Sequence, residues 1–320
     1  MGTLNFSQTA AWLLGRDNFL ILTHVRPDGD TVGCAAGLCV ALREQGKAAH
    51  ILPDPNTSRV YTGYLEGLLA PADYVPGTVV AVDMAARSMF HQGAQPYLDK
   101  VDLTIDHHPS QEFYAKDTCL DAGRAACGEL VYDIVRQWGP VSPRVALPLY
   151  MAVSTDCGCF VYSNTNAACH RVAADLLDTG IDCYPINRKH FRTKSFKRLK
   201  LESMLTDGME LYDGGRIAVV TLTLEMMAQL DAREEDIDDI SAFVGQVEGV
   251  STGVTVRQLT PERCKISLRT DPGDLDASRV CALLGGGGHA AAAGASVTGS
   301  PAHARDAILA AIRTIQAEKE

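Results

Sequence analysis

The sequence predicts an α/β protein: an N-terminal domain with a parallel sheet, joined by a connecting helix to a smaller α+β C-terminal domain with a mixed sheet. Three observations lead to this fold class. In the first half, short apolar runs alternate with longer segments of helical periodicity, as in parallel sheets with helical crossovers. A polar and basic segment then interrupts the alternation. In the second half, two strand-like runs follow each other with no helical segment between them, which predicts the mixed sheet.

Four apolar runs in the first half are predicted as strands, at residues 19–23, 48–52, 78–82 and 101–105. Helical periodicity is found at residues 31–44, 127–138, 144–154 and 167–178. At the start of the first of these helices we expect Asp30 to be the N-cap. We expect Gly33 to let the same helix pack closely on the sheet.

The basic segment that follows is predicted as a connecting helix over residues 188–207. Beyond it, strands are predicted at residues 216–222, 250–259 and 263–270, and helices at 224–230, 234–247 and 276–284. The domain boundaries that we expect are 1–187 for the N-terminal domain, 188–212 for the connecting helix and linker, and 213–320 for the C-terminal domain.

The composition is that of a soluble globular protein, with 46% hydrophobic and 21% charged residues. The first residues lack the cationic start and apolar core of a signal peptide, and the ten cysteines are scattered without a CxxC pair. We therefore expect reduced thiols, no membrane association and a cytoplasmic location. A net charge of -10 argues against a protein that coats long nucleic acid, but it leaves a small anionic substrate open.

Side chains suited to metal binding stand where predicted strands and helices end. The candidate ligands are His24, Asp28, Asp30, Asp83, His107 and Asp156. A single aspartate after a strand is more often an N-cap or a turn residue, but the whole set is harder to explain in that way. Imidazole mixed with carboxylate favours manganese, iron, cobalt or zinc, and manganese is our first choice. Two ions about 3.5 to 4 Å apart would need a shared carboxylate, and they would activate water for attack on phosphorus.

A second candidate site is the glycine run at residues 285–288 with His289 after it. Glycines let backbone N–H groups approach an anion closely, and His289 adds a side-chain donor. The run matches neither GxxxxGK[ST] nor GxGxxG, so triphosphate and dinucleotide sites are not indicated, and a flexible turn explains it equally well. Arg269, near the end of the preceding strand, could clamp a phosphate, although a surface arginine is the commoner outcome.

These residues resemble the DHH phosphoesterase family over nearly the whole chain. HVRPDGD at residues 24–30 is similar to the first motif of the family, Asp83 to the second and the Asp106-His107-His108 triplet to the third. Asp156, which its local sequence alone would not single out, is similar to the fourth motif. GGGGHAAAAG at residues 285–294 resembles the signature of the DHH-associated C-terminal domain.

The resemblance implies two manganese ions, with magnesium or cobalt as alternatives. One ion would be bound by His24, Asp28 and Asp83, and the other by Asp30, Asp83, His107 and Asp156. His108 would act near the leaving oxygen as proton donor or charge stabiliser, and Asp106 would orient the neighbouring histidine. The substrate phosphate would be held by Arg269, Gly286, Gly287, Gly288 and His289. Cys157 departs from the threonine that is common in relatives, and an inert small side chain is the role that we expect for it.

Within the family, the compact layout and residues 192–201 are similar to the bacterial nano-RNases. That branch implies hydrolysis of short RNA, such as pApA and pGpG, to mononucleotides, and conversion of 3'-phosphoadenosine 5'-phosphate (pAp) to AMP. It also implies no stable binding of long nucleic acid, and a homodimer is expected by analogy. The alternatives are a cyclic-dinucleotide phosphodiesterase, a single-strand DNA exonuclease, and a catalytically silent nucleotide-binding module.

Overall fold

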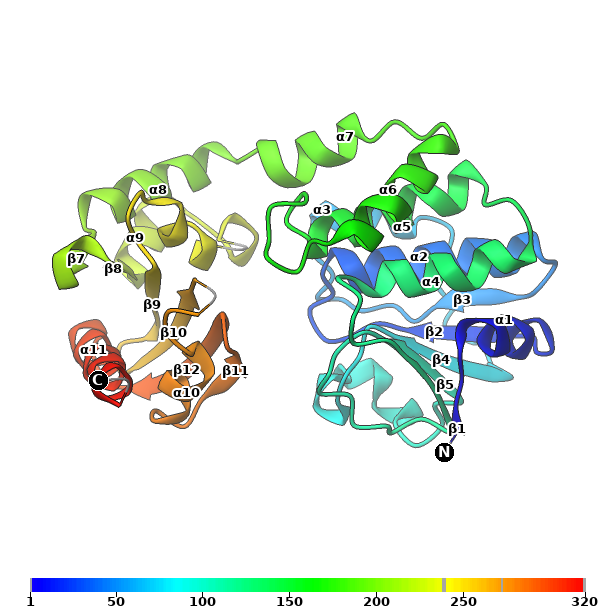
Figure 1. Ribbon diagram of the computed structural model, residues 1–320, viewed down its shortest axis with the longest axis horizontal. Coiled ribbons are helices and arrows are strands. Elements are labelled where there is room, and N and C mark those ends of the chain that lie inside the picture. Colours follow the sequence, from blue (N-terminus) through cyan, green and yellow to red (C-terminus); the bar gives the residue numbers. More distant parts are fainter. Residues whose placement is uncertain (1, 238–239, 272, 319–320) are drawn as a thin grey trace. The chain divides into compact units, whose positions relative to one another are not determined.

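The computed structural model describes residues 2–237, 240–271 and 273–318 (Figure 1). The chain divides into two compact units, Met1–Thr193 and Lys194–Glu320. Each unit contains one six-stranded sheet with its own hydrophobic cores. Among the helices that the structure describes, none is both long and apolar enough to cross a bilayer.

The sheet of the first unit is entirely parallel and has the strand order β1-β6-β5-β4-β2-β3. Its strands are β1 (Gly2–Thr3), β2 (Phe19–Leu22), β3 (Ala49–Ile51), β4 (Thr78–Val82), β5 (Leu103–Asp106) and β6 (Asp117–Leu120). The parallel sheet and its four apolar strands are thereby confirmed. No predicted strand covers β1 or β6, because β1 has only two residues and β6 is half polar.

The central strands are buried on both faces, as the apolar runs predict. Phe19 and Ile21 of β2 belong to one core, while Leu20 and Leu22 belong to the core on the opposite face. The first core is covered by α1 (Phe6–Leu14), α2 (Gly29–Glu44), α4 (Cys127–Val135), α5 (Pro143–Asp156) and α6 (Ala167–Asp178). Figure 1 shows α2, α4 and α5 together on one side of this sheet.

Two expectations for the first long helix are wrong. The N-cap of α2 is Asp28, whose Oδ1 accepts hydrogen bonds from the backbone N–H groups of Asp30 (3.1 Å) and Thr31 (3.2 Å). The helix therefore starts one residue before Asp30. Gly33 faces α5 and not the sheet, because a Cβ at this position would lie 2.4 Å from the carbonyl oxygen of Pro148. The glycine thus permits close packing between two helices.

The predicted connecting helix at 188–207 is also wrong as a single element. The chain forms α7 (Tyr184–Asn187), a π-helical turn (Arg188–Arg192) and then α8 (Phe196–Asp207). Thr193 is extended, and Ser195 starts a new helix because its side chain accepts from the N–H of Arg198. The boundary between the two compact units falls at this interruption.

The sheet of the second unit is mixed, as predicted, with the order β11-β12-β10-β9-β8-β7. Only the β8–β9 pair is parallel among the strand pairs that the structure describes. The strands are β7 (Glu210–Tyr212), β8 (Ile217–Leu222), β9 (Thr252–Thr260), β10 (Arg263–Thr270), β11 (Gly287–His289) and β12 (Ala292–Thr298). The helices of the unit besides α8 are α9 (Leu224–Gln229), α10 (Ala277–Ala282) and α11 (Pro301–Ala317).

The helix predicted at 234–247 is wrong for the described residues. Short 3-10 turns stand there, at Glu234–Asp236, Ile240–Ala242 and Val244–Gln246, while residues 238–239 lie outside the described part. The turns bury Ile240 and Val244 in a core shared with α8 and β8. These apolar side chains fill the core from short turns, without a continuous helix. Their helical spacing was therefore misleading.

Candidate metal centre

The predicted ligands meet at the edge of the parallel sheet where β2, β4 and β5 end. His24 follows β2, Asp83 directly follows β4, and His107 directly follows β5. Because neighbouring parallel strands end at the same edge, side chains far apart in sequence come together there. Asp28 and Asp30 lie at the start of α2, and Asp156 is the last residue of α5.

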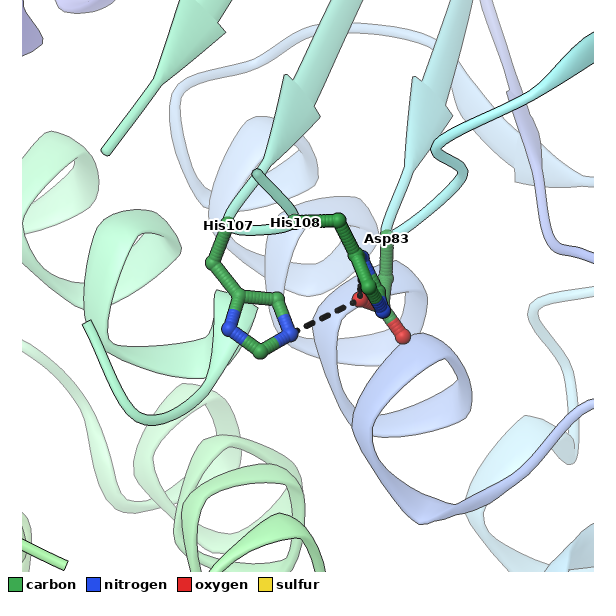
Figure 2. A group of neighbouring side chains, drawn as sticks. All are labelled: Asp83, His107 and His108. Carbon is green, nitrogen blue, oxygen red and sulfur yellow. Dashed lines mark ion pairs between the residues drawn. The ribbon is translucent and has the colours of Figure 1, made fainter. Parts of the chain in front are cut away.

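The ligand-type side chains form three overlapping groups, of which His24, Asp28 and Asp83 are the first, Asp30, His107 and Asp156 the second, and Asp83, His107 and His108 the third. In the first group, His24 Nε2 lies 3.4 Å from Asp28 Oδ1 and 3.8 Å from Asp83 Oδ2. In the second, His107 Nε2 lies 3.8 Å from Asp30 Oδ2, 3.7 Å from Asp156 Oδ2 and 3.5 Å from Asp83 Oδ1. Figure 2 shows His107 facing Asp83 from the end of the adjacent strand. These separations are longer than the usual N–H···O distance of about 2.7–3.2 Å, and they suit atoms that share one ion.

Three observations show that the residues fit divalent cations. Asp83 Oδ1 is buried and has no hydrogen-bond partner among the described residues. Burial, reinforced by the charge of Asp28, raises the pKa of Asp30 to about 7, and burial with the charge of Asp30 raises the pKa of Asp156 to about 7. Burial and the neighbouring carboxylates also raise the pKa of Asp83 well above its usual value. A cation between these carboxylates would remove both the repulsion and the unpaired oxygen.

The backbone also shows the constraint at this edge. Asp83 has a φ of +56°, a left-handed conformation that is uncommon for aspartate. Such strained residues concentrate at functional sites, where the surrounding structure holds them in place. The conformation lets the chain leave β4 sharply while the carboxylate of Asp83 stays among the ligands.

Backbone contacts orient the two histidines. His24 Nδ1 lies 3.0 Å from the carbonyl oxygen of Val25, and His107 Nδ1 lies 3.1 Å from that of Arg124. A carbonyl oxygen can only accept, so Nδ1 carries the proton in each ring and Nε2 offers its lone pair to the carboxylate side. Sequence reasoning missed the contact with Arg124 because the two residues are 17 positions apart.

Asp106 serves a different purpose from the other carboxylates. It is fully buried, and its Oδ1 lies 2.8 Å from His108 Nδ1. Its Oδ2 accepts a hydrogen bond of 2.6 Å from Gln111 Nε2, a residue that the motif analysis did not select. Burial lowers the pKa of His108, but the hydrogen bond to Asp106 and the charges of the neighbouring carboxylates together outweigh it, so that the pKa is raised overall. Asp106 therefore fixes the ring of His108 and leaves its Nε2 available.

Cys157 is buried beside the candidate ligand Asp156. Its Sγ lies 3.1 Å from the Sγ of Cys169, and both side chains are fully buried. Hydrogen bonding to Cys169 and burial raise the pKa of the Cys157 thiol far above its usual value. A protonated thiol is a poor nucleophile and a poor metal ligand, in keeping with the inert role expected for it.

The predicted substrate-binding residues lie in the second unit. In the strand register, Arg269 of β10 and His289 of β11 are both paired with Ala292 of β12, so the three side chains share one face of the sheet. The glycine run is not a free turn, because residues 287–289 form β11. A Cβ at Gly286 would lie 2.2 Å from the carbonyl oxygen of Gly294, so this position requires glycine for strand packing.

Comparison with known proteins agrees with this architecture. Residues 18–153 match the N-terminal domain of the DHH family, and residues 214–318 match the DHHA1 domain. A relative from Thermus thermophilus is 32% identical over 283 residues, which cover 87% of this chain and 84% of the relative. This chain belongs to the DHH family. The family resemblance inferred from the motifs is therefore confirmed.

The DHH-family relative from Thermus thermophilus is named bifunctional oligoribonuclease and PAP phosphatase NrnA, as is one from Bacillus subtilis. The latter is 23% identical over 316 residues, covering 95% of this chain and 96% of the relative. A solved exopolyphosphatase-related protein from Bacteroides fragilis has a TM-score of 0.86 at 24% identity, over 97% and 96% of the two chains. RecJ of Thermus thermophilus, solved with Mn²⁺, has a TM-score of 0.51 at 14% identity, over 96% of this chain and 55% of RecJ. The two structures support the fold alone.

Proposed function

We propose that this chain is a manganese-dependent phosphoesterase that hydrolyses short oligoribonucleotides to mononucleotides and dephosphorylates pAp to AMP. The observation that carries the proposal is the set of overlapping ligand groups, joined by Asp83 and His107, at one edge of the parallel sheet. Support for the substrates comes from the names of relatives that align with most of the chain. All ten cysteines are free, which suits the reducing cytoplasm in which we expect the enzyme to act.

In this proposal His24, Asp28 and Asp83 hold one ion. The second ion is held by Asp30, Asp83, His107 and Asp156, and Asp83 serves both. Mixed imidazole and carboxylate donors favour manganese over magnesium, and magnesium or cobalt are the substitutes that we expect. Bound at these residues, divalent ions would supply Lewis-acid chemistry, polarising a phosphoryl oxygen and making water more acidic.

The protein itself supplies orientation and a proton. His108 Nε2 faces away from Asp106, and we assign it to protonate the leaving oxygen of the scissile phosphate. Asp106 keeps the ring in place through Nδ1, and Gln111 in turn holds Asp106. The result is a chain of fixed hydrogen bonds from Gln111 to the group that acts on the substrate.

The C-terminal domain is assigned to substrate recognition. Arg269 offers a planar guanidinium that matches two phosphate oxygens, and His289 shares its face of the sheet. Gly287 and Gly288 are assigned to the same phosphate site, whereas the backbone N–H of Gly286, which the sequence also suggested, already donates to the carbonyl oxygen of Cys281 at 2.9 Å. In this proposal residues 1–187 are the catalytic domain and residues 188–212 the connector. The C-terminal domain would select substrates that carry a terminal phosphate.

The test uses purified full-length protein with Mn²⁺ and a panel of substrates. We expect pApA, pGpG and pAp to be hydrolysed much faster than a 20-nucleotide RNA, single-stranded DNA or a cyclic dinucleotide. Equal rates on short and long RNA would reject the short-substrate specificity, and a preference for cyclic dinucleotides or DNA would assign the enzyme to another branch. Binding of pAp without any turnover would identify a silent nucleotide-binding module.

A further inference from the structure

The segment of residues 124–128 contacts the side chains of two candidate ligands of one ion, His107 and Asp30. The carbonyl oxygen of Arg124 lies 3.1 Å from His107 Nδ1. The backbone N–H groups of Cys127 and Gly128 donate to Asp30 Oδ2 (2.7 Å) and Oδ1 (2.9 Å). No such contact joins this segment to His24 or Asp28 among the described residues.

The third ligand, Asp156, is tied to the same segment through Asn164. The side-chain amide of Asn164 donates to the carbonyl oxygen of Ala125 at 3.1 Å and to that of Asp156 at 3.1 Å. Asn164 is exposed and stands on the loop after α5. It therefore couples the backbone that carries Asp156 to the backbone that orients His107.

The side chain of Glu129 holds residues 124–126 of this segment in place. Its side chain is fully buried, and Oε1 accepts from the N–H groups of Ala125 (2.8 Å) and Ala126 (3.3 Å). Its Oε2 lies 3.2 Å from the guanidinium of Arg124. Burying a carboxylate is costly unless it is paired and hydrogen-bonded, and here all of its partners belong to the segment that orients the ligands.

We infer that Glu129 and Asn164 are positioning residues for one of the two ions, the one assigned to Asp30, His107 and Asp156. Neither contacts the assigned ligands of that ion through a ligand atom, so each acts through the backbone. The inference rests on the proposed function, because it takes the two side-chain groups as metal sites. It adds an asymmetry between the two sites, because Glu129 and Asn164 do not position the ligands of the ion assigned to His24 and Asp28.

The decisive measurement is Mn²⁺ binding to full-length protein by calorimetry, which counts the ions and gives the affinity of each. In Glu129→Gln the amide oxygen can still accept from the two N–H groups, but the charge that pairs with Arg124 is lost. In Glu129→Ala both functions are lost. We expect one ion to bind about 10-fold more weakly in the glutamine variant, and still more weakly in the alanine variant. The other ion should keep its affinity within about twofold.

Asn164→Ala provides a second variant that does not disturb the core, because Asn164 is exposed. It should weaken the same single ion, and activity at saturating Mn²⁺ should return toward that of the wild type. The matched control is Glu202→Gln, since Glu202 is also a buried carboxylate paired with cations, Lys194 and Arg198, but lies in the second unit. That control should leave both affinities unchanged.

The outcomes separate this inference from the proposal on which it depends. Wild-type protein that binds no Mn²⁺ would overturn the proposed function and the inference together. Two ions in the wild type, with unchanged affinities in folded Glu129 and Asn164 variants, would overturn the inference alone. Equal weakening of both ions would also reject it, because a general loosening of the fold does not discriminate between the sites. Loss of folding in the Glu129 variants leaves the Asn164 variant to decide.

Discussion

Asp83 Oδ1 lies 3.5 Å from His107 Nε2 and has no hydrogen-bond partner among the described residues, although it is buried. A charged oxygen in this situation destabilises the fold unless a cation lies beside it. The arrangement that suits a bound metal ion therefore makes the metal-free protein less stable. The predictions below follow from this arrangement and from the residues around it.

Replacing Asp83 by Asn should separate stability from activity. The amide removes the unpaired charge, so the metal-free variant should melt a few degrees higher than the wild type, about 2–4 °C for each kcal/mol gained. Hydrolysis of pApA should fall by at least about 1,000-fold, because both ions lose a ligand. Calorimetric melting and turnover measure the two effects. The control is Asp99→Asn, at an exposed carboxylate paired with Arg87, which should change neither.

Stability of the metal-free protein should fall as the pH rises through about 7. The folded pKa of Asp30 and of Asp156 is raised from 3.8 to about 7, so between these values the folded state binds more protons than the unfolded chain. The stability that these groups contribute is complete below about pH 4 and is lost as the pH passes the folded value. We expect a melting temperature lower by roughly 5 °C at pH 8 than at pH 5.5.

Mn²⁺ should reverse this dependence, because it binds the deprotonated carboxylates and releases their protons. The gain in melting temperature on adding Mn²⁺ should therefore be larger at pH 8 than at pH 5.5. An equal gain at both values would contradict the raised pKa values. Asp156→Asn should flatten the pH profile of the metal-free protein.

His108→Ala should lower kcat by about 100-fold to 10,000-fold for substrates with a poor leaving group, the usual range for general acid catalysis. Its effect on a p-nitrophenyl phosphodiester should be far smaller, because that leaving group needs no proton. Affinity for Mn²⁺ should stay within about threefold of the wild type. A large loss of Mn²⁺ affinity, with equal effects on both substrates, would instead make His108 a metal ligand.

Arg269→Ala should raise KM for pAp and dinucleotides about 10-fold or more, since a bidentate phosphate contact is lost. Arg269→Lys should recover only part of this, because an ammonium cannot reproduce the planar fork. Arg263 stands on the same strand and is exposed, so Arg263→Ala is the control for a lost positive charge. Equal changes in KM for the two alanine variants would reduce the role of Arg269 to general electrostatics.

Gly33→Ala should destabilise the protein by about 1–3 kcal/mol, because the new Cβ would meet the carbonyl oxygen of Pro148 at 2.4 Å. Urea denaturation measures the change in the free energy of unfolding. Gly63→Ala is the control, since a Cβ at Gly63 enters open space and its backbone needs no positive φ. An unchanged stability in Gly33→Ala would show that α2 and α5 can move apart at no cost.

Most candidate ligands could be predicted to lie together because they follow a local pattern, whereas Asp156 was selected only through the family resemblance. His24, Asp83 and His107 follow apolar runs, and parallel strands bring their carboxyl ends to one edge whatever the length of chain between them. The N-cap of this helix was harder to predict, because either aspartate of HVRPDGD could occupy it. Asp30 does not cap the helix, because its carboxylate accepts hydrogen bonds from the backbone N–H groups of Cys127 and Gly128, about 97 residues along the chain.

By itself the sequence determined the two sheet types, the family and the chemical identity of the candidate ligands, because periodicity and residue type are properties of short segments. Only the tertiary structure decided which groups support those ligands. Gln111 holds Asp106, Glu129 holds the segment beside His107, and Gly33 admits α5. The Gln111 contact spans five positions and the Glu129 contact four, while Gly33 meets a helix far along the chain. Each role depends on hydrogen-bond or packing geometry in the folded chain, which no periodicity of the sequence records. The first motif thus predicts candidate ligands, while the tertiary structure determines how each side chain is held.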